Sequence, residues 1–220
     1  MIDVLYQDNR IMVCLKPPGV LSTDEPGGLP ELLRAQTGTA CFRTVHRLDQ
    51  VVGGVIVLAR SREAAKRLSA QVESRSFGKQ YLAVVHGKPE ADAGTFKDLL
   101  ARDAAAHRTY VTAEPGKDIR EAVLDYKLLA HRDGLSLVQI TLHTGRTHQI
   151  RAQFSSRGMP LAGDRKYGAP EAKLEGIALW SHKLQFLHPQ TEESVEFTAY
   201  PLLVEPWVRF EDILKEGHKP

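Results

Sequence analysis

Short apolar runs alternate with turn residues in the first third of the chain. Two short strands are predicted over 5–15, and the consecutive prolines at 17 and 18 end the second, because proline cannot donate to a strand ladder. A short helix is predicted after Gly28, since Pro30 is tolerated in a first helical turn. The continuous apolar run 53–59 has the length of a buried strand.

An amphipathic helix is predicted after this strand, over about 62–75. Ser61 is a suitable N-cap, and Ala64, Leu68 and Val72 share one helical face. The next strand, 79–87, is apolar on both of its alternating faces and should be buried on both, with Tyr81 pointing into the interior or into a cleft.

The second half of the chain has mainly the period of strands. The predicted elements are a β-meander over about 95–142 with strands near 109–113, 122–130 and 135–142, a helix over about 147–157, a hairpin of 177–187 with 195–200, and a closing helix over 202–213 that carries Trp207 and Phe210. No internal repeat, low-complexity tract or linker separates these elements. The chain is therefore expected to form one α/β domain of the α+β type over residues 1–220.

The composition is that of an ordinary folded protein. Of its 220 residues, 42% are hydrophobic and 25% charged, which excludes disordered, collagenous and disulfide-scaffold classes. No uninterrupted apolar window approaches the length of a membrane span, and the first residues do not resemble a signal peptide. Cys14 and Cys41 are too few for a disulfide framework, so a cytoplasmic location is expected.

Positive charge is concentrated in two stretches, although the formal net charge is only +2. Residues 60–79 contain six Lys or Arg against two Glu, and residues 141–166 contain five against one Asp. These stretches could lie on one surface that faces a polyanion, although most charged runs only solvate a surface.

Two polar clusters could carry chemistry. Val45–Gly54 places an imidazole, a guanidinium and a carboxylate before a buried strand, and Thr144–Arg151 places two arginines and a histidine at the start of a predicted helix. In such a helix Arg146 and Ile150 share a face and Arg151 points elsewhere, so one arginine can face inward. Metal-ligand spacing and nucleotide-binding loops are absent from the sequence, and neither a metal nor a cofactor is expected.

Four ordered motifs resemble the RluA-type RNA pseudouridine synthases. They are His46-Arg47-Leu48-Asp49, Lys79–Gly87, Gly145–Arg151 and Gly163–Gly168, and 5–8 with 16–19 also look like the start of that family. The resemblance covers nearly the whole chain and implies a long mixed, mostly antiparallel sheet with flanking helices and a central cleft. Many relatives carry an amino-terminal S4 RNA-binding domain. This chain is expected to begin directly at the catalytic domain, so the surface of that domain is expected to bind the RNA.

Two positions depart from the family pattern. Val52-Gly53-Gly54 stands where the family usually has Thr-Ser-Gly, and Gln153 stands where a histidine is common. These departures bear on substrate positioning more than on the chemistry.

The resemblance implies three catalytic residues. Asp49 would be the nucleophile, and Arg146 would pair with it, because a neighbouring positive charge favours an ionised carboxylate. Tyr81 would stack on the target base and accept the carbon 5 proton, a role that needs local help because phenol is a weak base.

The remaining candidates concern RNA, in which the target uridine should be flipped or unpaired. The expected RNA contacts are His46, Arg47, Arg62, Lys66, Arg67, Lys79, His148 and Arg151. Leu48 and Ile150 are expected to line the substrate pocket. The partner is predicted to be ribosomal or transfer RNA, and the protein is predicted to be a monomer.

Two other functions remain open from the residues alone. A non-catalytic RNA-binding module would keep the basic surface but would not need Asp49, Tyr81 and Arg146 together. A hydrolase built on His46 and Asp49 would need an activated water or a Ser or Cys nucleophile in a fitting motif, and neither is visible.

Overall fold

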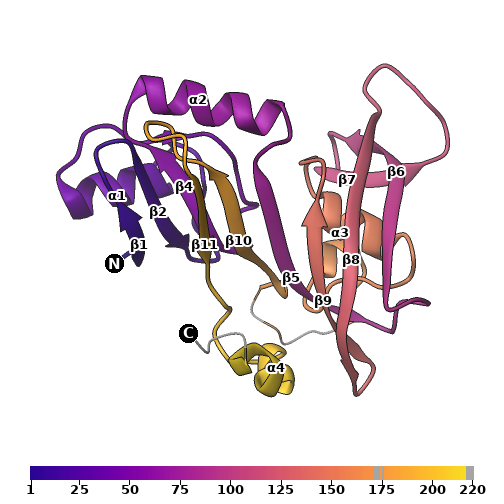
Figure 1. The fold of residues 1–220 in the computed structure, drawn as a ribbon. Helices are drawn as coiled ribbons and strands as arrows, with labels where there is room; N and C mark the ends of the chain where they lie inside the picture. The colour runs from indigo at the N-terminus through magenta and orange to yellow at the C-terminus, as the bar shows by residue number, and fades with distance from the viewer. Residues whose placement is uncertain (171–173, 175, 217–220) are drawn as a thin grey trace. The chain divides into compact units, whose positions relative to one another are not determined.

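The computed structural model describes residues 1–170, 174 and 176–216, and the chain divides into two compact units (Figure 1). Unit 1 comprises residues 1–79 and 180–201, and unit 2 comprises residues 80–179 and 202–220. In the described residues, eleven strands form one mixed sheet, to which each unit contributes a part.

Unit 1 contains the part of this sheet with strand order β1-β2-β4-β10-β11 and the short β3 beside β4. Its elements are β1 (Val4–Gln7), β2 (Ile11–Lys16), α1 (Leu29–Thr37), β3 (Arg43–Thr44), β4 (Gly53–Ala59), α2 (Arg62–Glu73), β10 (Leu179–Leu187) and β11 (Ser194–Thr198). The pair β4–β10 is parallel, with Trp180 opposite Gly53, and the other pairs are antiparallel. The sheet is therefore mixed.

Helix α2 forms as its sequence predicts. The Ser61 side chain accepts a hydrogen bond from the Ala64 backbone N–H and so caps the first turn. Ala64 and Leu68 are buried in a core with Val57 of β4 and Phe186 of β10. The helix thus covers one face of the unit 1 sheet (Figure 1).

Unit 2 contains the antiparallel part of the sheet, with strand order β5-β9-β8-β6-β7. Its elements are β5 (Gly78–His86), β6 (Ala93–Asp103), β7 (Arg108–Thr112), β8 (Arg120–Arg132), β9 (Leu135–Leu142), α3 (Gln149–Ser155), the 3-10 helices η1 (Arg165–Tyr167) and η2 (Trp207–Phe210), and α4 (Glu211–Glu216). Helix α3 covers one face, where the Phe154 ring packs edge-on against Phe96 and Tyr126, with centroids 5.0 and 6.1 Å away.

The α+β class is confirmed, with eleven strands and four α-helices in the described part of the chain. Strand β6 was not predicted, although the β-meander around it was. The predicted closing helix over 202–213 is wrong at its start: Trp207 and Phe210 lie in η2, and α4 follows from Glu211. The single-domain arrangement and the central cleft stay predictions.

Membrane crossing needs a helix that is both long and apolar. Among the helices of residues 1–170 and 176–216, none combines the two properties.

Candidate functional site

Asp49 lies in the loop between β3 and β4 of unit 1, and the backbone on both sides of it is held by side chains. The Ser22 hydroxyl donates to the Leu48 carbonyl at 2.8 Å and accepts from the Leu48 N–H at 3.1 Å. The loop turns back on itself where the Val52 N–H donates to the Asp49 carbonyl at 2.9 Å. Leu48 is buried, whereas Asp49 is half-buried and Arg47 is exposed.

Lys16 ties the Asp49 loop to the Lys16–Gly19 turn. Its ammonium is fully buried and donates to the carbonyls of Pro17, Val20 and Gln50 at 3.0, 2.7 and 3.1 Å. Burial lowers the pKa of Lys16 to about 8, an effect that the Asp49 carboxylate partly opposes. The Asp49 loop is therefore anchored by a buried cation that the carboxylate itself helps to keep charged.

His46 has a structural position rather than the RNA-contacting one expected for it. It is buried beside Phe77, with ring centroids 5.2 Å apart, and its Nε2 accepts a hydrogen bond from the Val57 N–H of β4 at 3.2 Å. Burial and the charge of Lys79 lower the pKa of His46 to about 3. A neutral, enclosed imidazole cannot bind a phosphate as a cation. His46 instead accepts the hydrogen bond of the Val57 N–H, which lies past the point where β3 stops pairing with β4.

The two glycines that follow the loop are required by close packing. A Cβ on Gly53 would lie 2.6 Å from the Trp180 ring, and one on Gly54 would lie 2.3 Å from the Ser181 carbonyl. Gly54 also has φ +120°, which side-chain-bearing residues rarely adopt. Glycine at position 53, where the family usually has serine, thus lets β10 pack closely against β4.

Tyr81 belongs to unit 2, where it lies on the same sheet face as α3. It is buried on β5 directly opposite Ile140 of β9, and Ile140 in turn lies opposite Tyr126 of β8. Directly opposite residues in antiparallel strands point to one face, and Tyr126 packs against Phe154 of α3. Tyr81 of the Lys79–Gly87 motif and helix α3, which begins within the Gly145–Arg151 motif, therefore lie on the same face of the sheet.

The shared helical face predicted for Arg146 and Ile150 is wrong, because α3 begins only at Gln149 and His148 before it is left-handed, with φ 53°. Arg146 is exposed outside the helix, and its Nε donates to the Glu121 carbonyl at 3.1 Å. Ile150 is buried. The inward-facing arginine of this segment is therefore not Arg146.

Arg151 is that inward-facing arginine, and its side chain is only 6% exposed. Its Nε and Nη2 donate to the two carboxylate oxygens of Asp164 at 2.7 and 2.9 Å. The guanidinium also lies over the Tyr167 ring, 4.9 Å from its centroid. Arg151 was expected to contact RNA, and in the structure its side chain is enclosed in unit 2.

His148 belongs to the same cluster. Its Nδ1 lies 3.0 Å from the Tyr167 hydroxyl, which also accepts a hydrogen bond from the Thr109 N–H at 2.8 Å. The half-buried His148 thus lies against the buried Tyr167, and its expected RNA contact stays a prediction.

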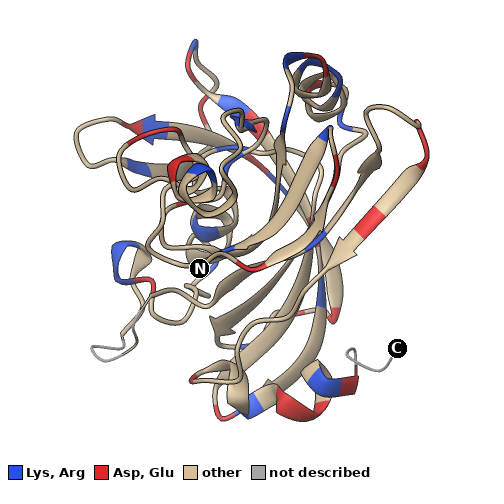
Figure 2. Cartoon of the chain, turned by 90° about the vertical axis from the view of Figure 1, so that its left-hand side faces the viewer, with Lys and Arg blue, Asp and Glu red and all other residues tan. Residues whose placement is uncertain are grey.

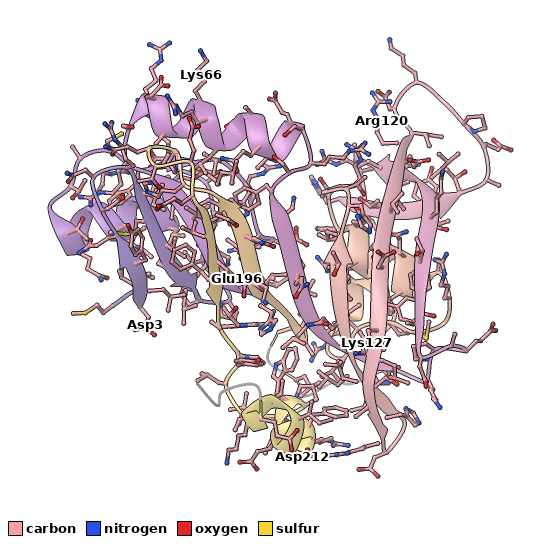
Figure 3. The ribbon with its side chains drawn as sticks, in the orientation of Figure 1. Asp3, Lys66, Arg120, Lys127, Glu196 and Asp212 are labelled. Atoms are coloured by element: carbon pink, nitrogen blue, oxygen red, sulfur yellow. The ribbon has the colours of Figure 1, made fainter. Side chains whose placement is uncertain are left out.

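The basic residues of α2 differ in how far their charge is already compensated. Arg67 pairs with Glu63 and with Glu192, both at 3.0 Å, so basic and acidic bands share this helix (Figure 2). Lys66 points away from the unit 1 sheet into solvent (Figure 3), and Arg62 is also exposed. Lys79 is half-buried, and burial lowers its pKa.

Four supporting residues were not identified as candidates from the sequence, namely Lys16, Ser22, Asp164 and Tyr167. Lys16, Asp164 and Tyr167 stand inside quoted motifs, and their burial alone distinguishes them. Among the residues that the structure describes, no group of three His, Cys, Asp or Glu side chains is arranged to hold a metal.

Comparison with known proteins points to one enzyme family. The model of the family described as RNA pseudouridylate synthase matches residues 10–156. The chain is 36% identical to "Uncharacterized RNA pseudouridine synthase YhcT" of Bacillus subtilis over 88% of the chain and 67% of that protein. It is also 36% identical to "Dual-specificity RNA pseudouridine synthase RluA" of Escherichia coli K12, over 89% of the chain and 91% of that protein.

A solved structure agrees with these sequence matches. The human protein "RNA Pseudouridylate Synthase Domain Containing 1" has a TM-score of 0.82 and 25% identity, over 94% of this chain and 86% of its own.

Proposed function

Because the chain belongs to the RNA pseudouridylate synthase family, we propose that it converts a uridine of ribosomal or transfer RNA to pseudouridine with Asp49 as the nucleophile. Family membership identifies the chain as an RNA pseudouridine synthase, an isomerase, and counts against the hydrolase and the non-catalytic module. The observation that carries the proposal for Asp49 is its loop, which Ser22 and Lys16 anchor on both sides of a half-buried carboxylate.

The reaction itself needs no cofactor. The bond between N1 of uracil and C1′ of ribose breaks, a bond from C5 to C1′ forms, C5 loses a proton and N1 gains one. The atoms balance without an oxidant, a reductant or a second substrate. The protein must therefore supply a nucleophile, a surface that keeps hold of the detached base, and a route for the C5 proton.

Asp49 suits the first task because its backbone is fixed before substrate arrives. Nucleophilic catalysis gains from a reacting group held in near-attack geometry, and a loop anchored at Leu48 and Gln50 loses little freedom on binding. Tyr81 is proposed to stack on the detached uracil and to relay the proton.

The guanidinium that pairs with Asp49 is proposed to be that of Arg151, which reverses the roles expected for the two arginines. An enclosed guanidinium interacts more strongly with a carboxylate than one in water, and Arg151 is enclosed where Arg146 is exposed. Arg146 then joins Arg47 among the proposed contacts with RNA phosphates.

Leu48 and Ile150 stay proposed as pocket residues, and both are buried apolar side chains within the Asp49 and Arg151 motifs. The protein is proposed to act as a monomer on RNA.

The test is nucleoside analysis of ribosomal and transfer RNA, transcribed without modification and incubated with the protein. We expect pseudouridine at one or a few positions, with an equal loss of uridine. RNA that is bound but unchanged would support a binding module. Released uracil or cut chains without pseudouridine would support a hydrolase, and either result would contradict the proposal.

A further inference from the structure

The Arg151–Asp164 pair is almost completely buried. Its side chains are 6% and 1% exposed, whereas Arg67–Glu63, Arg132–Asp212 and Arg157–Asp98 each have at least one partner that is more than a quarter exposed. Removing two charges from water costs several kcal/mol per ion, and well-packed apolar residues often serve stability as well or better. Stability alone is therefore a weak reason for this pair.

The geometry of the pair fixes the guanidinium in one orientation. Asp164 occupies the Nε and Nη2 edge through two charge-assisted hydrogen bonds of 2.7 and 2.9 Å. Tyr167 supports the flat face of the guanidinium, with a centroid distance of 4.9 Å. The Nη1 side consequently points away from Asp164, and this is the side that would meet a second anion.

The backbone around Asp164 is held as firmly as its side chain. Its carbonyl accepts from the N–H groups of Tyr167 and Ala169 at 2.9 and 3.1 Å. Gly163 before it has φ +78°, and a Cβ there would lie 2.1 Å from the Gly176 carbonyl. The chain thus places Asp164 through a glycine that no other residue can replace without a shift.

We propose that Asp164 is a positioning residue for pseudouridylation, which acts by aiming the Nη1 side of Arg151 at the anionic group of the reaction. This inference rests on the proposed function, in which that group is the Asp49 carboxylate. Asp164 does not touch the substrate. It converts a flexible arginine into a guanidinium whose position is set before RNA binds.

A second aspartate–arginine pair of unit 2 offers a matched control. Asp98 binds Arg157 through two hydrogen bonds of 3.0 Å each, and the Arg157 guanidinium lies over Phe96 at 3.9 Å. Both arginines therefore pair with two oxygens of one aspartate and lie over an aromatic ring. Asp98 and Arg157 are more exposed, at 12% and 30%, and belong to none of the family motifs.

The experiment measures kcat, KM and thermal unfolding for Asp164→Asn and Asp98→Asn on an RNA that the wild type modifies. We expect Asp164→Asn to lower kcat about 100-fold, the loss typical of a small misplacement of a catalytic group, with KM within about threefold. Asp98→Asn should keep wild-type kcat at a temperature where both variants are folded.

A second pair of variants separates positioning from folding. Asp164→Glu keeps the charge but moves the carboxylate by one methylene, so it should lower kcat even if the Asn variant does not fold. If Asp164 acts through Arg151, Asp164→Asn should cost little more in an Arg151→Lys background, because the two effects are not additive.

The outcomes are distinct. Equal kcat for the Asp164 and Asp98 variants, or full additivity with Arg151→Lys, would overturn the positioning role and leave the proposed function intact. A wild-type protein without any pseudouridine synthase activity would overturn the proposed function, and this inference with it.

Discussion

At the residue scale, the Asp49 loop depends on one buried ammonium group. Lys16 donates to three carbonyls, one of which belongs to Gln50, the residue after Asp49. The ammonium is fully buried, and burial lowers its pKa to about 8 from the usual 10.5. Burying the charged Lys16 therefore lowers the stability of the folded protein by an amount that depends on pH.

Comparison of the wild type with Lys16→Met should reveal this pH-dependent change in stability. Between pH 8 and 10.5 the unfolded chain binds more protons at this lysine than the folded one, so the wild type gains stability as pH rises. The free energy of unfolding of the wild type, minus that of Lys16→Met, should increase by about 1 kcal/mol from pH 7 to pH 9. Denaturant unfolding at both pH values measures it, and a constant or falling difference would contradict a buried, charged Lys16.

Gln153 shows why one departure from the family pattern concerns packing. Its Nε2 donates to Asp98 at 2.6 Å, while its buried Oε1 has no hydrogen-bond partner. The opposite amide orientation would turn an oxygen toward Asp98 and toward the carbonyls of Phe96 and Ala122. Gln153 therefore acts as a donor to Asp98, a role that the imidazole of a histidine can also fill.

Substitution of Gln153 should follow this donor role. Gln153→His should keep wild-type stability, because a ring N–H can reach Asp98. Gln153→Glu should lower the free energy of unfolding by about 3 kcal/mol, since it buries a second carboxylate against Asp98. Thermal unfolding gives the order, and an equally stable Glu variant would contradict the assigned amide orientation.

Tyr81 has two proposed tasks that one substitution can separate. Tyr81→Phe keeps the ring and removes the hydroxyl, so kcat should fall while RNA affinity stays. Tyr81→Leu should lose both. Steady-state rates on one RNA distinguish the variants, and a fully active Phe variant would leave Tyr81 only as a stacking surface.

At the element scale, strands with clear apolar periodicity were predictable and polar ones were not. β4 and β9 carry runs of buried residues, and the structure confirms both. β6 contains Gly94, Lys97 and Asp98 and is buried at few positions, so its pattern carries no strong period. Its strand structure comes from pairing with β7 and β8, which no local signal reveals.

The start of the helix predicted over 147–157 was also misplaced, because side-chain contacts that the local pattern does not reveal decide it. The segment before α3 is held by the Gln149 side chain, which accepts from the Arg146 N–H at 3.0 Å and from the Thr144 hydroxyl at 2.8 Å. These bonds favour a turn over helix at His148. The motif residues were readable from the sequence, but their supports were not, because Ser22 and Lys16 lie 26 and 34 residues from the backbone groups they hold.

Helix α2 permits a prediction about the length of RNA that the protein senses. Arg62 follows the last residue of β4, whereas Asp49 precedes the first, so the strand separates them by about 20 Å. The positive charge of α2 can therefore act only on RNA that extends well beyond the target uridine.

Replacing Arg62 and Lys66 with Gln should flatten the salt dependence of binding to a long RNA by roughly 0.7 per lost phosphate contact on a single strand. The rate at saturating RNA should change little. Arg67→Gln is the control with a smaller effect, because Arg67 already pairs with Glu63 and Glu192. An unchanged slope for the double variant would show that α2 does not contact RNA.

At the scale of the whole molecule, the proposed reaction assigns different tasks to the two units. Unit 1 supplies Asp49 on an anchored loop, and unit 2 supplies Tyr81 and Arg151 on one face of its sheet. In the proposed reaction the carboxylate of Asp49, rather than another acidic residue such as Asp164, is the reacting group.

The most direct measurement follows tritium from carbon 5 of uridine in a substrate RNA, under single turnover, with wild type and Asp49→Asn. The wild type should release one tritium to water for each pseudouridine formed, because C5 loses its proton when it bonds to the ribose. Asp49→Asn should bind the RNA with similar affinity and release tritium at less than about 1% of the wild-type rate, as expected when a nucleophile is removed. Release by the Asn variant at a rate close to that of the wild type would contradict Asp49 as the nucleophile.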